Sequence, residues 1–224
     1  MSINLLNFQK IKSIANSYHA QLVAVSKTKP LDDILALHQE GQIVFGENYV
    51  QELADKFKEA PSTIDWHFIG HLQTNKVKFI QPIAKLIHGI DSEKLLIEIN
   101  KQAAKNNSVS NLLLQIHIAQ EESKFGLDAN ELTTILENYS NGKYSNIRIK
   151  GLMGMASFTE DKLQIKKEFT ELKQIFDRNK STEEFDTLSM GMSSDYQIAL
   201  DCGSTMIRIG SAFFGERHYK PING

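Results

Sequence analysis

The chain has 224 residues, of which 41% are hydrophobic and 23% are charged, and its formal net charge is -2 at pH 7. This composition is typical of a globular protein, and the small net charge excludes the global basic field that draws a protein to nucleic acid or to a membrane surface. The one cysteine, Cys202, excludes an internal disulfide and a cysteine-rich zinc site, which is typical of a reducing cytoplasm. We therefore expect a cytoplasmic protein with a single domain over 1–224 that binds neither nucleic acid nor membrane.

The first segment, 1–21, predicts an amphipathic helix with Ile3, Leu6, Ile11 and Ile14 among its apolar positions. It lacks the uninterrupted apolar run and the small-residue cleavage site of a signal peptide. No run of ~18 consecutive apolar residues occurs in the sequence, so no transmembrane helix is expected.

Short apolar runs then alternate with longer amphipathic stretches. The runs predict strands at 21–26, 42–46, 65–70, 85–90, 111–118, 147–153, 185–189 and 205–210. The stretches predict helices at 31–40, 48–59, 73–81, 92–106, 128–140, 161–178 and 194–201. Apolar strands that alternate with helices indicate an α/β fold with a parallel sheet covered by helices. Eight of them in a chain of this length predict a (β/α)₈ TIM barrel, here preceded by one extra helix.

An open doubly wound sheet is the alternative fold. It is less favoured, because the G-x-G-x-x-G turn that usually follows the first strand of such a sheet is missing. The sequence has Ser-Lys-Thr-Lys-Pro at 26–30 in that place.

Polar and glycine-rich segments follow the predicted strands, at the end of a barrel where the functional residues usually lie. These segments are Lys27, FGEN (45–48), IGHLQTNK (69–76), HGIDS (88–92), GMAS (154–157), SMGMSS (189–194) and RIGSAFFG (208–215). Singly, a glycine at a strand end indicates only a turn, and His71 or His88 indicates a structural hydrogen bond. Their joint occurrence is what indicates a site.

The last two strand ends predict a phosphate site. Ser193 or Ser194 is expected to cap a helix that begins near Asp195, with backbone N–H groups directed into the barrel mouth. Gly210 would let the backbone approach an anion, and Ser211 could donate its N–H or its hydroxyl group. Because the first and eighth strands of a closed barrel are neighbours, the phosphate site, Arg208 and Lys27 should face one cavity.

A lysine beside a phosphate site is typical of two chemistries. One is Schiff-base formation with a phosphorylated sugar, and the other is a pyridoxal 5'-phosphate (PLP) site in which the lysine forms the imine to the cofactor. Arg208 favours the second, because a permanent cation beside the pyridine nitrogen keeps that nitrogen unprotonated.

The motifs together resemble those of the pyridoxal phosphate homeostasis proteins. They are VAVSKTKP, FGENYVQEL, WHFIGHLQTNK, IDS, GLMGMAS, SMGMSSDYQIAL and GSTMIRIGSAFFGER, in this order from about residue 20 to 217. The members of this family are small single-domain PLP-binding barrels of the alanine-racemase-like fold, PLP fold type III, and they carry an extra N-terminal helix.

The resemblance implies a role for six residues. Lys27 would carry PLP as a Schiff base, Arg208 would lie near the pyridine nitrogen, and Asn48 would lie close to the cofactor. The phosphate would be surrounded by Ser193, Gly210 and Ser211. His71 and Met155 would lie near the mouth, without assigned contacts.

The resemblance further implies a protein without established turnover, which buffers PLP or delivers it to apo-PLP enzymes, and which we expect to be a monomer. Racemases of this fold use a second acid/base from an additional C-terminal domain and a partner subunit. With nine residues after Gly215, we expect no such domain here. A PLP-dependent racemase-like enzyme is the alternative, favoured if Tyr49 or Tyr196 stands over the cofactor. A phosphosugar-binding barrel without a cofactor is the third possibility.

Overall fold

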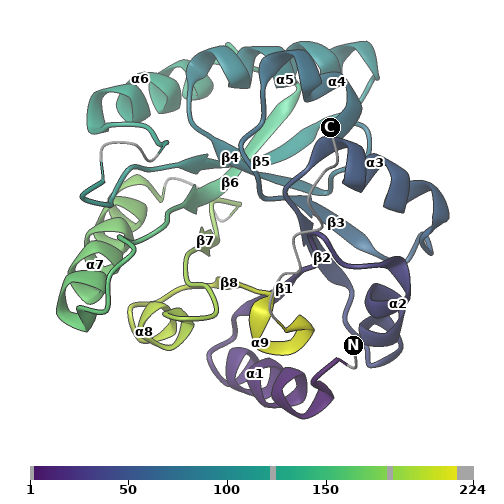
Figure 1. The fold of residues 1–224 in the computed structure, drawn as a ribbon. Coiled ribbons are helices and arrows are strands. Elements are labelled where there is room, and N and C mark those ends of the chain that lie inside the picture. Colours follow the sequence, from purple (N-terminus) through teal and green to yellow (C-terminus); the bar gives the residue numbers. More distant parts are fainter. Residues whose placement is uncertain (1–2, 122–124, 181–183, 216–224) are drawn as a thin grey trace, which may run out of the picture.

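The computed structural model describes residues 3–121, 125–180 and 184–215. Its strands form a closed barrel in the order β1 to β8, and every neighbouring pair, including β8 with β1, is parallel. Figure 1 shows the helices arranged around these strands. The predicted TIM barrel is confirmed, and the closure between β1 and β8 excludes the open sheet.

The strands of the barrel are short, as is usual for this fold. They are β1 (Gln21–Val25), β2 (Val44–Glu47), β3 (Asp65–Phe68), β4 (Leu86–Ile90), β5 (Ser110–Gln115), β6 (Ile147–Met153), β7 (Thr187–Ser189) and β8 (Met206–Ile209). The α-helices in the described ranges are α1 (Leu5–Ser17), α2 (Leu31–Gln39), α3 (Val50–Glu59), α4 (Val77–Ile80), α5 (Glu93–Lys105), α6 (Ala129–Ser140), α7 (Lys162–Asn179), α8 (Tyr196–Asp201) and α9 (Ser211–Phe214).

The predicted elements exist, although most of their bounds shift by one or more residues and two of them also change in character. The strand predicted at 111–118 ends at Gln115, and Ile116 forms an isolated bridge with Leu127 instead. The helix predicted at 73–81 consists of a 3₁₀ turn over Thr74–Lys76 followed by the single-turn helix α4. Helix α9 was not predicted from the sequence.

The expected N-terminal helix is α1, and the first two residues of the segment 1–21 lie outside the described residues. Its buried side chains are Phe8, Ile11 and Ala15, whereas Leu6 is 82% exposed. Leu6 therefore lies outside the face that packs on the barrel, because at 100° per residue it falls opposite Phe8, Ile11 and Ala15.

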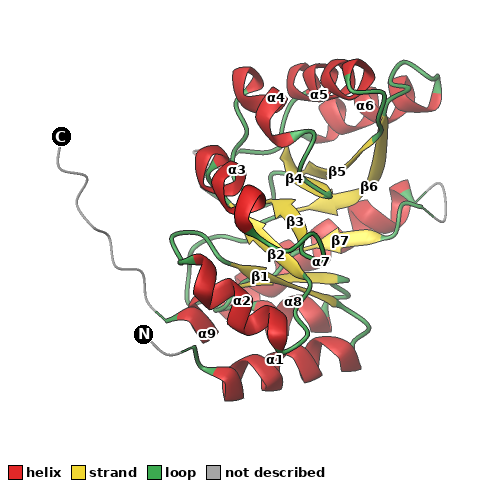
Figure 2. Ribbon diagram, turned by 90° about the vertical axis from the view of Figure 1, so that its right-hand side faces the viewer, coloured by secondary structure: helices red, strands yellow, loops and turns green. Residues whose placement is uncertain are grey.

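Helix α1 also holds α9, which lies beside it in Figures 1 and 2. The Asn4 N–H group donates to the carbonyl of Phe213 (2.9 Å), and Asn7 Nδ2 donates to the carbonyl of Ala212 (2.6 Å). The rings of Phe8 and Phe213 meet edge to face, with centroids 5.6 Å apart. These contacts fix the short helix that follows β8.

Alternation along β1 decides where its last residues point. Val23 belongs to a small apolar cluster with residues of five other strands inside the barrel, whereas Ala24 packs in the larger core between barrel and helices. Val25 again faces inward and lines a cavity at the barrel mouth. Lys27 therefore falls on the inner side, and Ser26 falls on the outer side.

In the described ranges, no helix is both long and apolar enough to cross a lipid bilayer.

Candidate functional site

A cavity of about 340 Å³ lies at the barrel mouth, within the usual size range of small-molecule sites. Its wall includes all the residues that the sequence predicts to bind a ligand: Lys27, Asn48, Ser193, Arg208, Gly210 and Ser211. Met155 lines it too, as expected for a residue near the mouth. The cavity is built from the strand ends and the loops that follow them, and the closure of β8 on β1 brings its two ends together.

Lys27 is half-buried and is the second residue after β1. The two other lysines at predicted strand ends do not line this cavity. Lys76 is exposed, with Nζ 5.9 Å from the ring centroid of Phe79. Lys29 is half-buried, and its Nζ donates to the carbonyl of Phe214 (2.8 Å) at the end of α9.

Gly210 joins the ends of β8 and β1. Its N–H donates to Ser193 Oγ (3.4 Å), which brings the loop after β7 against the end of β8. A Cβ atom at this position would lie 2.8 Å from the carbonyl oxygen of Val25. The close approach of β1 therefore requires a glycine at this position.

The predicted serine cap of α8 was wrong. The residue before the helix is Asp195, and its Oδ1 accepts the N–H of Met192 (2.6 Å) within the same loop. Neither Ser193 nor Ser194 therefore caps this helix, and Ser193 Oγ accepts the Gly210 N–H instead. The Asp195 carboxylate does not cap the helix either, because the bond it accepts comes from Met192, which precedes the helix.

Asn48 follows β2 and contributes an unusual atom to the cavity wall. Its Oδ1 is buried and has no hydrogen-bond partner among the described residues. Buried polar atoms in native proteins nearly always have a partner. The amide oxygen of a residue that lines the cavity is thus left with unused hydrogen-bonding capacity.

Arg208 projects from β8 into the barrel and is 5% exposed. Its Nη1 donates to Ser189 Oγ (2.6 Å) and its Nη2 donates to the carbonyl of Gly154 (3.2 Å). Burial lowers the pKa of the guanidinium from 12.5 to about 10, and the charge of Asp195 acts in the opposite direction. Arg208 thus remains a cation at neutral pH and gives the cavity a positive floor.

A buried chain of hydrogen bonds continues from Arg208 across the barrel. Ser189 Oγ lies 3.2 Å from His88 Nδ1, and His88 Nε2 lies 3.0 Å from His67 Nδ1. Arginine only donates, so the Ser189 hydroxyl oxygen accepts from Arg208. The donor and the acceptor of the two histidine contacts are set by the tautomers of His88 and His67.

Both histidines of this chain are buried and neutral. Burial and the charge of Lys85 lower the pKa of His67 from 6.5 to about 3. Burial, then the charges of His67 and Arg208, lower the pKa of His88 well below its usual value. Sequence reasoning assigned no role to His67 or Ser189, although alternation along β3 and β7 turns both into the barrel.

His71 lies beyond the end of β3, outside the cavity wall. Its Nδ1 is 3.0 Å from Asp91 Oδ2, and its ring stacks on Phe125 with centroids 4.2 Å apart. These contacts fit the structural hydrogen bond expected of an isolated histidine. No group of three histidine, cysteine, aspartate or glutamate side chains suited to a metal ion occurs in the ranges that the structure describes.

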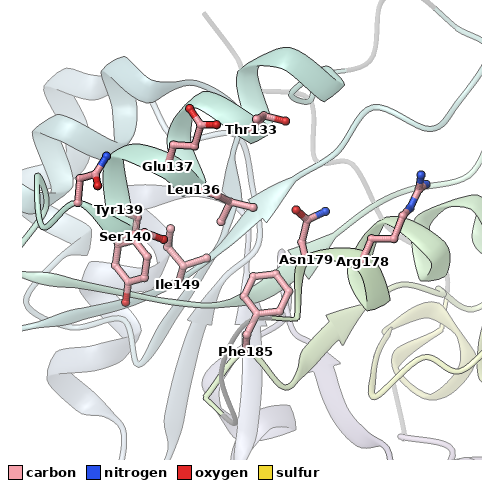
Figure 3. A pocket seen from close by; sticks show the side chains of 10 residues that line it. Thr133, Leu136, Glu137, Tyr139, Ser140, Ile149, Arg178, Asn179 and Phe185 are labelled. Carbon is pink, nitrogen blue, oxygen red and sulfur yellow. The ribbon is translucent and has the colours of Figure 1, made fainter.

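A second cavity, of about 420 Å³, lies between α6 and α7 on the outside of the barrel (Figure 3). Ile149 and Phe185 lie between side chains of α6 on one side and those of Arg178 and Asn179 on the other. None of the residues predicted to bind a ligand lines it. The site at the barrel mouth therefore remains the candidate.

Comparison with known proteins gives concordant matches. Residues 6–218 match the family described as alanine racemase, N-terminal domain. The chain is 37% identical to the pyridoxal phosphate homeostasis protein of Haemophilus influenzae, over 97% of this chain and 95% of that protein. PipY of Synechococcus elongatus, solved without PLP, is 30% identical with a TM-score of 0.85, covering 92% of this chain and 99% of PipY. The PLP-bound structure of PipY, at the same identity, gives a TM-score of 0.79 over 88% and 93% of the two chains.

Proposed function

The chain belongs to the pyridoxal phosphate homeostasis protein family, and from this premise we propose that it holds PLP in the cavity at the barrel mouth and acts as a carrier or buffer of the cofactor. One observation carries the proposal: Lys27, Arg208 and the Ser193–Gly210 contact line the same cavity. When bound, PLP supplies an aldehyde that combines reversibly with an amine and releases water. We place this function in the cytoplasm and expect a monomer.

The residues present fit PLP. The cavity has room for a small ligand, and the buried Asn48 Oδ1 lacks a partner that a polar ligand would supply. Among the described residues, Lys27 is the one lysine that lines the cavity. Its amine is therefore the group that would bond to the aldehyde carbon. Its place two residues after the end of β1 leaves its long side chain able to reach into the mouth.

We assign phosphate recognition to the loop after β7 and the residues after β8. Ser193 and Ser211, one from each segment, both line the cavity, and their hydroxyl group and backbone N–H are the donors that we assign to the phosphate. The N–H groups of a first helical turn have no partner within the helix, and Ser211 is the first residue of α9. Each hydrogen bond to a phosphate contributes about 1.5–3 kcal/mol.

Arg208 is assigned to the ring end of the ligand. Its bonds to Ser189 and Gly154 hold the guanidinium in place, and its charge disfavours a second positive charge nearby. A pyridine nitrogen beside it stays unprotonated, so the ring withdraws electrons weakly. This property suits storage of the cofactor better than catalysis at Cα of an amino acid.

The carrier role is favoured over an enzymatic one by the composition of the cavity wall. Among the described residues that line it, only Lys27 and Arg208 are ionisable. Racemisation needs a second acid/base on the face opposite the lysine, and Tyr49 and Tyr196, the tyrosines considered for it, do not line the cavity. Because alanine racemase shares this barrel, we test the absence of turnover directly.

Three measurements test the function. We expect the purified protein to absorb visible light and to lose this absorbance on treatment with borohydride. Peptide mapping should then place the reduced adduct on the peptide that contains Lys27. An adduct mainly on Lys76 would refute the assignment of Lys27. A protein that stays colourless when PLP is added would refute PLP binding and would favour a phosphosugar ligand. PLP-loaded protein should exchange no Cα hydrogen of L-alanine in deuterated water. Rapid exchange that depends on Lys27 would establish an enzyme instead.

Delivery is tested separately from storage. The PLP-loaded protein is mixed with an apo-PLP enzyme, and the recovery of activity is followed in time. Recovery faster than the release of free PLP indicates directed transfer, whereas recovery at that rate leaves buffering as the function.

A further inference from the structure

A cluster of charged side chains lies on the outer side of the barrel, directly behind Lys27. Lys56 Nζ of α3 lies 2.7 Å from Glu47 Oε1 of β2 and 2.7 Å from Glu52 Oε1 of α3. The Glu47 side chain is fully buried, and those of Lys56 and Glu52 are 10% and 22% exposed. Lys56 thus joins a strand of the barrel to the helix that covers it.

This cluster holds both chain neighbours of Lys27. Ser26 Oγ donates to Glu47 Oε1 (2.6 Å), and the Ser26 carbonyl accepts from Lys56 Nζ (2.9 Å). On the other side, the Thr28 N–H donates to Glu52 Oε1 (2.6 Å). The lysine that points into the cavity therefore lies between two residues whose positions are set from outside the barrel.

Thr28 shows that these bonds hold the backbone in a conformation it would not keep alone. Its φ is 64°, in the left-handed region that is strained for a β-branched residue. Such a conformation persists only where the surroundings enforce it. The bond from the Thr28 N–H to Glu52 is one enforcing contact, and Lys56 holds Glu52 in place for it.

We propose that Lys56, together with Glu47 and Glu52, is a positioning residue for Lys27: it fixes residues 26–28 so that the Lys27 amine is presented to the cavity. The inference rests on the proposed function of Lys27. It concerns only how readily the amine meets the aldehyde, because Lys56, Glu47 and Glu52 do not line the cavity.

The alternative is that the cluster only anchors α3 to β2. Anchoring of α3 and positioning of Lys27 predict different effects on the binding of two ligands, PLP and pyridoxamine 5'-phosphate. Pyridoxamine 5'-phosphate has the same ring and phosphate as PLP but carries an amine where PLP has the aldehyde, so it cannot combine with Lys27. A loss of anchoring disturbs the binding of both ligands alike, whereas a misplaced Lys27 affects only PLP.

The test compares covalent capture of PLP with binding of pyridoxamine 5'-phosphate in Lys56→Met. This substitution removes the ammonium group and keeps most of the apolar stem. We expect the rate of covalent capture, followed by absorbance and by borohydride trapping, to fall about 10- to 100-fold, since small displacements of a reacting group have effects of this size. The affinity for pyridoxamine 5'-phosphate should change less than twofold.

Glu52 provides a second pair of variants in case Lys56→Met does not fold. Glu52→Ala removes the acceptor of the Thr28 N–H and should slow capture, whereas Glu52→Gln retains an acceptor oxygen and should slow it less. Lys58→Met is the matched control, because Lys58 lies on the same helix but is 69% exposed and pairs with Asp55. It should behave as the wild type.

The outcomes separate the inference from its premise. Equal losses for the two ligands, or unchanged capture in Lys56→Met and Glu52→Ala, would overturn the positioning role. If borohydride traps no adduct on Lys27 in the wild-type protein itself, the proposed function fails first, and the inference fails with it.

Discussion

The buried histidine pair should make the protein sensitive to mild acid, and His67→Gln is the variant that tests this. In the fold the pKa of His67 is about 3, whereas an imidazole in an unfolded chain titrates near 6.5. Between these two values the unfolded chain binds more protons than the folded one. The contribution of a neutral His67 to stability is therefore complete above pH 6.5 and is lost progressively as the pH falls towards 3.

The size of the effect follows from the difference between the two pKa values. Each pH unit within the window removes about 1.4 kcal/mol per histidine, so acidification from pH 6.5 to 5 removes about 2 kcal/mol through His67 alone. Glutamine does not titrate. The difference in unfolding free energy between wild type and His67→Gln should therefore narrow by about 2 kcal/mol over this range.

Urea denaturation of the PLP-free protein at several pH values measures this difference, because bound ligand would add its own stabilisation. Trp66, the single tryptophan, is buried in β3 beside His67 and reports unfolding by fluorescence. His19→Asn is the control: His19 is exposed, and asparagine tolerates its φ of 55°. Parallel pH profiles for wild type and His67→Gln would refute the reasoning.

Three further predictions concern the cavity and its surroundings. Lys27→Ala should abolish the borohydride-trapped adduct but retain weak PLP binding through the phosphate, measured by equilibrium dialysis; complete loss of binding would contradict a separate phosphate site. Ser193→Ala should weaken PLP binding about tenfold, since one hydrogen bond to phosphate is lost, and should leave the weaker binding of pyridoxal unchanged in a fluorescence titration. Equal effects on both ligands would exclude a phosphate contact. Lys29→Met should lower the unfolding free energy by about 1–2 kcal/mol in urea, because a charged bond to the Phe214 carbonyl is lost, with the adduct on Lys27 intact. An unchanged denaturation midpoint would show that this bond does not stabilise the fold.

The barrel and much of the cavity wall could be predicted from the sequence because both follow from periodicity. Apolar strands alternating with helices give the barrel, and the residues after the strands give its mouth. Lys27 and Arg208 could be placed on one side because β1 and β8 must meet when eight strands close. Those inferences need only the order of the elements.

What could not be predicted depends on contacts between distant segments. Helix α9 has four residues, too few to form alone, and it exists because α1 binds its carbonyl groups. The need for Gly210 comes from the carbonyl of Val25, which lies far away in the sequence. The hydrogen bond of Lys56 to the Ser26 carbonyl and that of the Thr28 N–H to Glu52 likewise join elements whose register only the structure gives.

The packing of α1 on α9 sets the order in which the molecule can become functional. Asn7 and Ala212, which meet there, are 205 residues apart in the chain. At a synthesis rate of about 5–20 residues per second, the second of them is made roughly 10–40 s after the first. Until then β1 lacks its partner β8, and Lys27 faces neither Arg208 nor the residues after β8 that we propose to bind the phosphate. In a nascent chain Lys27 is therefore present before the cavity around it has formed. Under the proposed function, the chain can hold PLP only after β8 has paired with β1 and α9 has packed on α1.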